Sequence, residues 1–176
     1  MSDKQAIRDL QTRLADRLQS ARAQPVSVAW LAVLMGDVRY LLPLSQSGEI
    51  FPLPSLTRVP YTQPWFCGVA NLRGGLYGVV DLLPLMGSAQ APVRNELAWA
   101  QARLVTLNPD SGVSCALVLD GLMGLRRQEA FQSFESAPPG SPAWFGQRFT
   151  DTHETSWQEI DLYALAQTAE FLSIGA

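Results

Sequence analysis

Few side chains in this 176-residue chain could act as a nucleophile, a general base or a metal ligand. His153 is the only histidine, and a catalytic triad or a cysteine–histidine pair would have to use it. Its neighbours are polar, as in a solvated loop. The two cysteines, Cys67 and Cys115, are far apart, so the sequence offers no zinc ligand set of usual spacing. We therefore expect no catalytic residue, no cofactor and no metal.

Two aspartates each follow an apolar run. Asp81 comes after Val79-Val80, and Asp120 ends a second run of strand composition. Asp side chains in such places commonly accept hydrogen bonds from nearby backbone N–H groups. We expect this local role for both carboxylates, in preference to a catalytic pair.

An arginine stands in a turn of this sequence. Gly74 and Gly75 follow Arg73, where a chain reversal needs backbone freedom, and an apolar run over 76–80 comes next. The guanidinium has five donors in a planar fork, so it can bind loop carbonyls or the carboxylate of a partner. An arginine fixed on a turn suits docking better than catalysis. The same group could instead bind Glu49 and backbone within one molecule, and the two roles are compatible.

This segment resembles the signature of the CheW family, the adaptors that couple chemoreceptors to a histidine kinase. In that family a Gly-Val-x-Asn-Leu-Arg-Gly turn leads into an apolar strand that ends in Asp-Leu; residues 68–74 match the turn and residues 79–82 match the strand end. Weaker matches follow the family's order at 35–40, at Glu49-Ile50 and at 116–122. The long polar N-terminus and the Pro/Trp-rich composition indicate the PilI branch, which serves type IV pili.

The resemblance covers residues 26–172 and implies a mainly β fold of two small five-stranded SH3-like barrels packed together. An N-terminal helical extension over 1–25 precedes this CheW-like domain. We place subdomain 1 at about 26–87 and subdomain 2 at about 96–165. An exchange of terminal elements between the two subdomains stays open.

The periodicity of apolar residues predicts the individual elements. An amphipathic helix is expected over 3–22, a linker over 87–95 and a short C-terminal helix over 162–172. The predicted strands, short apolar runs separated by Gly, Pro, Asn and Asp, are 26–35, 38–44, 76–82, 103–107, 114–119 and 157–162. Short strands in such an order favour small barrels over an alternating βαβ sheet.

The resemblance also implies the partners and the residues that bind them. Family members bind the cytoplasmic tip of a methyl-accepting chemoreceptor in the groove between the barrels. They bind the regulatory domain of a CheA-type kinase through an apolar end-to-end contact. The expected partner-binding residues are Leu44, Ser47, Glu49, Tyr61, Trp65, Asn71, Arg73, Gly74 and Arg103. Ser47 and Arg103 depart from the apolar residues usual there, and Trp65 can equally fill the core.

Charge and composition exclude several classes of function. A net charge of −3 and a pI near 5.1 disfavour a general nucleic-acid binder, which needs a basic face. Only 16% of residues are charged while 47% are hydrophobic, so some apolar surface is expected to be covered by partners. No apolar run approaches 18 residues, and no signal-peptide core follows Met1. We expect a cytoplasmic protein with free thiols and no direct membrane insertion.

Two other classes of function remain open. One is a small-molecule-binding barrel or a cryptic enzyme, with its ligand between the subdomains. The other is a structural subunit that self-assembles through the helix expected over 3–22.

Overall fold

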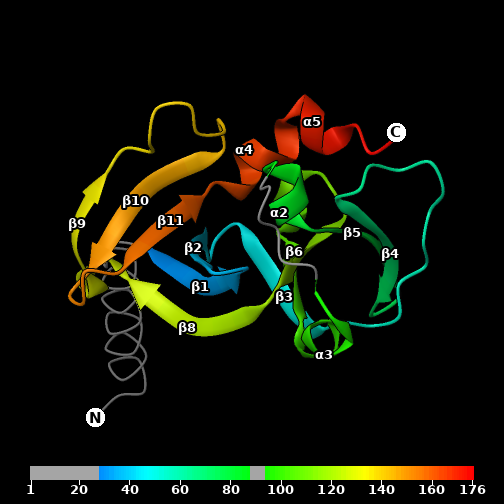
Figure 1. Cartoon of the computed structure of the whole chain (residues 1–176), viewed down its shortest axis with the longest axis horizontal. Helices are drawn as coiled ribbons and strands as arrows, with labels where there is room; N and C mark the ends of the chain where they lie inside the picture. Colours follow the sequence, from blue (N-terminus) through cyan, green and yellow to red (C-terminus); the bar gives the residue numbers. More distant parts are fainter. Residues whose placement is uncertain (1–27, 88–93) are drawn as a thin grey trace, which may run out of the picture.

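The protein is mainly β and consists of two strongly curved sheets that pack side by side (Figure 1). The computed structural model describes residues 28–87 and 94–176. The N-terminal helix expected over 3–22 and most of the linker expected over 87–95 lie outside these residues. Within the described ranges, no helix has the length and hydropathy needed to cross a membrane.

Sheet A has six strands in the order β8-β1-β2-β11-β10-β9. Their bounds are Ala29–Met35 (β1), Val38–Pro43 (β2), Gly121–Arg127 (β8), Phe131–Glu135 (β9), Phe145–Asp151 (β10) and Ser156–Ile160 (β11). Neighbouring strands are antiparallel except β2 and β11, which run parallel.

Sheet B has five strands in the order β3-β6-β7-β5-β4. Their bounds are Ser47–Pro52 (β3), Phe66–Leu72 (β4), Gly75–Val80 (β5), Arg103–Leu107 (β6) and Cys115–Leu119 (β7). Again one neighbouring pair, β5 and β7, is parallel. The expected five strands are therefore found in sheet B, while sheet A has one more.

Strands from both halves of the chain enter each sheet. Residues 26–87 supply β1 and β2 to sheet A and β3 to β5 to sheet B, and residues 96–165 supply β6 and β7 to sheet B and β8 to β11 to sheet A. Residues 47–119 thus form sheet B as one continuous stretch, enclosed in sequence by the two parts of sheet A.

The alternation of side chains along the strands divides the core into three clusters. Leu31, Val33 and Met35 of β1 point into a large cluster shared by both sheets, whereas Trp30 and Ala32 point into the interior of sheet A. In the same way β6 and β7 send alternate residues to the shared cluster and to the interior of sheet B. The shared cluster therefore fixes how the two sheets sit against each other.

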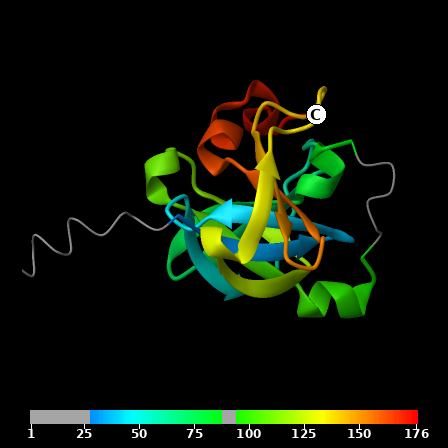
Figure 2. The same ribbon diagram turned by 90° about the vertical axis from the view of Figure 1, so that its left-hand side faces the viewer.

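Short helices connect the strands or follow them. They are α2 (Leu82–Leu85), α3 (Glu96–Gln101), α4 (Leu162–Gln167) and α5 (Ala169–Leu172), with 3₁₀ turns at Pro109–Ser111 (η1) and Gln128–Ala130 (η2). Figure 2 shows α4 and α5 in red on the side opposite α3. The C-terminal helix expected over 162–172 is present, but Thr168 is extended and divides it in two.

The predicted strands are all present, with ends shifted by up to three residues. Strands β3, β4, β8, β9 and β10 were not predicted. Residues 68–72, expected in a turn, instead complete β4, and only Arg73 and Gly74 form the turn. The glycine at 68 marks a bulge of β4, where its φ is +131° and a Cβ atom would strike the Thr57 carbonyl.

Candidate partner-binding site

The β4–β5 hairpin presents the arginine that the sequence singles out. Leu72 pairs with Gly75, so the turn has two residues, Arg73 and Gly74, with φ values of 49° and 85°. Positive φ at both positions is the geometry of a type I′ hairpin turn. The Asn71 Oδ1 accepts a 2.9 Å hydrogen bond from the backbone N–H of Gly74. The expected residues Asn71, Arg73 and Gly74 therefore form one rigid turn.

The Arg73 side chain binds Glu49, which was one of the two kinds of partner considered for it from the sequence. The Arg73 Nη1 lies 2.7 Å from the Glu49 Oε2, and the two side chains are 75% and 57% exposed. The guanidinium also lies 5.7 Å from the ring centroid of Phe51 on β3. Most of the pair remains open to solvent, so it can be reached by another protein.

Leu44 and Ser47 lie where the chain passes from sheet A to sheet B. Leu44 is exposed, and its N–H donates to the carbonyl of Ala29 at 2.9 Å. The Ser47 hydroxyl donates to the Pro43 carbonyl at 3.0 Å and so tightens this crossover. Leu44 directly follows β2 of sheet A, and Ser47 begins β3 of sheet B, two residues before Glu49.

Arg103 has a different environment from Arg73. It begins β6, opposite Pro52 at the far end of β3, and its Nη1 donates to the carbonyls of Gln101 and Ala102 at 2.9 and 3.0 Å. These bonds hold the guanidinium over its own backbone. The structure does not bring Arg103 into contact with Arg73 or Glu49.

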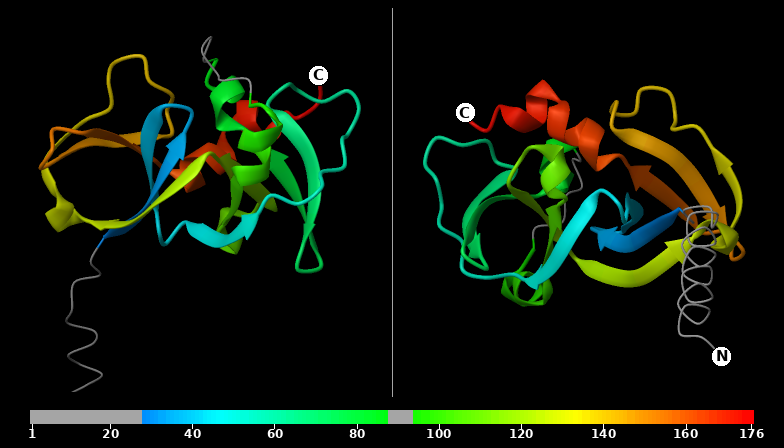
Figure 3. Two further views of the ribbon diagram at one scale, coloured as in Figure 1. Left: turned by 60° about the horizontal axis from the view of Figure 1, so that its bottom comes forward. Right: turned by 180° about the vertical axis from the view of Figure 1, so that it is seen from behind.

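The two aromatic residues expected at a kinase contact differ in exposure. Tyr61 is 89% exposed at a φ of 58°, and its carbonyl accepts a 3.0 Å bond from the N–H of Ala176. Trp65 is buried, and its ring stacks on Phe171 with centroids 6.2 Å apart. The views in Figure 3 show the segment between β3 and β4 standing out from sheet B, with the C-terminus close to it.

A buried ion cluster joins the two aspartates. Arg94, which the sequence analysis missed, donates through Nη1 to Asp81, and through Nε and Nη2 to Asp120 at 2.5 and 3.0 Å. Asp120 also accepts from the N–H of Gly36, in the turn between β1 and β2. Asp81 caps helix α2 through the N–H of Leu83. One cluster thus ties sheet A to sheet B.

The charges explain why Arg94 tolerates burial. Burial alone would lower the pKa of this guanidinium, but the hydrogen bonds and negative charges of Asp120 and Asp81 outweigh it and raise the pKa above its ordinary value. Arg94 stays charged, and both carboxylates have a counter-ion. A hydrogen bond to nearby backbone was expected for both aspartates and is found for Asp81, whereas Asp120 binds the N–H of Gly36, 84 residues away. Their shared arginine was not expected.

His153 and the two cysteines were the residues considered for catalysis or metal binding. His153 is exposed in the turn between β10 and β11, where its backbone N–H donates to Asp151. Residues 28–87 and 94–176 contain no group of three or more His, Cys, Asp or Glu side chains that could hold a metal ion. Cys67 and Cys115 are free thiols.

The fold and sequence match known proteins over most of their length. The family described as CheW-like domain matches residues 29–170. The chain is 28% identical over 165 residues to "Protein PilI" of Pseudomonas aeruginosa, covering 92% of this chain and 88% of that protein. It superimposes with a TM-score of 0.67 on the crystal structure of scaffolding protein TtCheW from Thermoanaerobacter tengcongensis, at 19% identity, covering 84% of this chain and 93% of the other.

Proposed function

Because this chain belongs to the family of CheW-like domains, we propose that it is a non-catalytic cytoplasmic adaptor. It couples the cytoplasmic tip of a methyl-accepting chemoreceptor to the regulatory domain of a CheA-type histidine kinase. Its similarity to PilI supports a role in the control of pilus-driven surface motility.

The observation that carries this proposal is the exposed Arg73–Glu49 pair on a rigid turn. A guanidinium with free donors can add a partner carboxylate without breaking its existing bond. Exposed apolar side chains flank the pair in sequence, Ile50 on β3 and Leu76 on β5. Arginine and exposed apolar side chains are both common in small, specific protein interfaces.

The receptor role is tested by pull-down with the receptor's cytoplasmic fragment. We expect Arg73→Glu to lower binding at least about tenfold, because it places like charges together and removes the donors. The matched control is Arg127→Glu, which makes the same change at an exposed position on β8 of sheet A.

The double variant Arg73→Glu/Glu49→Arg separates docking from folding. The exchanged charges restore an ion pair within the molecule while reversing what a partner meets. Receptor binding should stay lost in this variant. Recovery of binding to the wild-type level would show that Arg73 acts only within its own fold.

For the kinase contact we propose the surface around Tyr61. The exposed residues Leu172 and Ile174 lie in the C-terminal segment, and Ile174 accepts a backbone bond from Gln63 in the Tyr61 segment. The buried ring of Trp65 stacks on Phe171, which belongs to the same C-terminal segment as Leu172 and Ile174. Tyr61→Ala should weaken binding of the kinase regulatory domain, whereas Phe134→Ala, an exposed aromatic change on sheet A, should not.

A further inference from the structure

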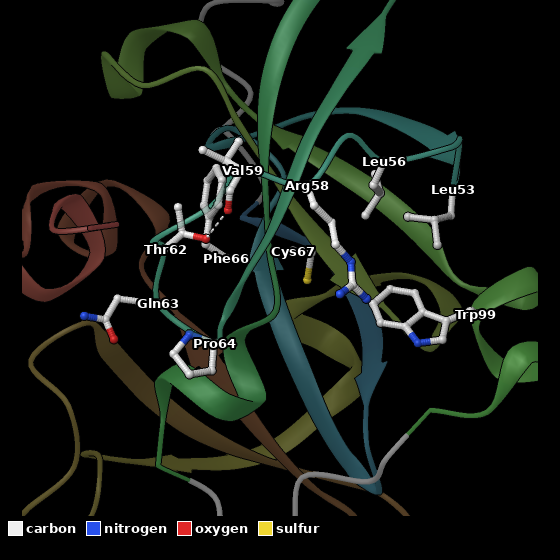
Figure 4. A pocket seen from close by; sticks show the side chains of 10 residues that line it. All are labelled: Leu53, Leu56, Arg58, Val59, Thr62, Gln63, Pro64, Phe66, Cys67 and Trp99. Atoms are coloured by element: carbon white, nitrogen blue, oxygen red, sulfur yellow. Dashed lines mark hydrogen bonds between the residues drawn. The ribbon is translucent and has the colours of Figure 1, made fainter. Parts of the chain in front are cut away.

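We propose that sheet B carries a binding site for a small organic acid, with one negative charge and an aromatic or branched aliphatic body. The site is a pocket of about 610 Å³ between the segment 53–65 and helix α3 (Figure 4). Sites for small molecules commonly have this size and lie at the open ends of β-barrels. Its walls include Leu53, Leu56, Arg58, Cys67 and Trp99.

The apolar wall of the pocket is part of the interior of sheet B. Leu53, Leu56, Cys67 and Trp99 are partly buried and pack against the buried cluster of that sheet. Burial raises the pKa of Cys67 to about 11, so its thiol is neutral and adds to the apolar surface. A ligand body placed here would extend the existing core and remove apolar surface from water.

The charge in the pocket selects an anion. Arg58 is exposed, and its guanidinium lies within ion-pair distance of no carboxylate in the described parts of the chain. None of the described residues that line the pocket is acidic. The Thr62 hydroxyl donates to the Val59 carbonyl at 2.9 Å and the Gln63 amide donates to the Gly175 carbonyl at 3.0 Å. Among the described residues that line the pocket, Arg58 alone carries a charge, and its guanidinium can recognise a carboxylate.

The aromatic wall is held in place before a ligand arrives. The Arg94 guanidinium lies 5.4 Å from the ring centroid of Trp99, and Arg94 is itself fixed by Asp81 and Asp120. Figure 4 shows the Arg58 side chain extending along the pocket toward Trp99. The acid would bind the Arg58 fork while its body lies against Trp99 and the leucines. Preorganised groups lower the entropic cost of binding.

This site is separate from the Arg73–Glu49 pair, and its test needs no partner protein. It also lies within sheet B, not between the two sheets where a ligand was considered from the sequence. The pocket does share Thr62 and Gln63 with the Tyr61 segment proposed for the kinase contact, but binding of a small acid can be measured without the receptor or the kinase.

Two fluorescent probes that differ by one sulfonate test the proposal on the full chain. They are 8-anilinonaphthalene-1-sulfonate, an aromatic anion, and N-phenyl-1-naphthylamine, its neutral counterpart. We expect Arg58→Gln to weaken binding of the anion at least about tenfold and to leave the neutral probe within twofold, because only the anion uses the charge-assisted bond. Arg127→Gln should change neither, and Trp99→Ala should weaken both.

Competition by unlabelled ligands supplies the second arm. We expect 3-phenylpropionate to displace the anionic probe from the wild-type protein, and 3-phenylpropanol, which lacks the charge, to be at least about tenfold less effective. Equal competition by the acid and the alcohol would overturn the proposal. So would an unchanged affinity of the anionic probe for Arg58→Gln with the circular dichroism of the wild type.

Discussion

Arg73 and Glu49 join the two edge strands of sheet B. Glu49 lies on β3 and Arg73 directly follows β4, the strands at opposite ends of the order β3-β6-β7-β5-β4, yet their side chains meet at 2.7 Å. The twist and curl of the sheet bring these edges together. The segment after β3 adds an isolated bridge, in which Thr57 and Val69 exchange both backbone bonds. The exposed ion pair thus links the two edges of sheet B, which curls into a barrel.

This exposed pair should contribute little to stability. We expect Arg73→Ala to lower the free energy of unfolding by less than about 1 kcal/mol, since water and salt screen such pairs. Urea unfolding followed by circular dichroism measures the change, and Glu49→Ala with the double variant completes a mutant cycle. A loss above about 2 kcal/mol in Arg73→Ala would contradict a mainly docking role for this side chain.

The buried arginine should behave in the opposite way. We expect Arg94→Met to destabilise the fold by about 3–5 kcal/mol, because Asp81 and Asp120 would keep their charges in a buried place without a counter-ion. Arg103→Met is the matched control, since that guanidinium binds only neighbouring carbonyls. Chemical unfolding measures both.

Removing the aspartate charges should repair much of this damage. The triple variant Arg94→Met/Asp81→Asn/Asp120→Asn leaves no buried charge in the cluster. It should recover about half or more of the lost free energy of unfolding. If it is as unstable as Arg94→Met alone, the cost comes from lost packing on Trp99 instead of from the orphaned carboxylates.

Two glycines with positive φ allow the steric and the conformational cost of an added Cβ atom to be measured separately. Gly68 and Gly124 have φ values of 131° and 89°, but a Cβ atom at Gly68 would strike the Thr57 carbonyl, while at Gly124 nothing lies within 4 Å. We expect Gly124→Ala to cost about 1–2 kcal/mol from backbone strain. Gly68→Ala should cost at least about 2 kcal/mol more, because the bridge to Thr57 must open. Equal melting temperatures for the two variants would contradict this account of the bulge.

The thiols should be unreactive at neutral pH. Burial raises the pKa of Cys67 to about 11 and that of Cys115 to about 12. At pH 8 the folded protein should therefore react with iodoacetamide on the order of a hundredfold more slowly than free cysteine, as followed by mass spectrometry. Both residues should label at the ordinary rate in urea.

The same shifts give the sign of a pH effect on stability. A thiol whose pKa is higher in the folded state ionises first in the unfolded chain. The thiol contribution is therefore fully present below the unfolded value of about 9 and is lost as the pH rises toward 11 and 12. A melting temperature that rises between pH 9 and pH 11 in the wild type, relative to Cys67→Ala, would contradict this sign.

Sequence patterns predicted the strands that lie between two cores and missed β8 and β9, whose side chains are mostly exposed. Strands β1, β6 and β7 are apolar on both sides because each lies between two cores, and such runs are easy to see. Strand β9, Phe131–Glu135, has mostly exposed side chains, and β8 has two glycines, so neither shows a strand pattern. Their pairing is decided by tertiary contacts.

The site was predicted in part for a similar reason. The turn at Asn71, Arg73 and Gly74 depends on local chemistry, which sequence shows directly. Arg94 depends on contacts 13 and 26 residues away, and it lies within 87–95, the stretch expected to be a linker. Two aspartates at the ends of neighbouring strands were the signal that a buried cation joins them.

Residues 47–119 form all of sheet B, and the two parts of sheet A lie before and after them in the sequence. Sheet B can therefore be completed before sheet A while the chain is being synthesised. Sheet B has all of its strands once β7 has emerged, at residue 119. Strand β2 must wait for its parallel partner β11, which ends at Ile160. A translation product that stops before Ser156 would therefore carry a complete sheet B beside a first hairpin whose inner edge is bare, a form that quality-control proteases and chaperones can recognise.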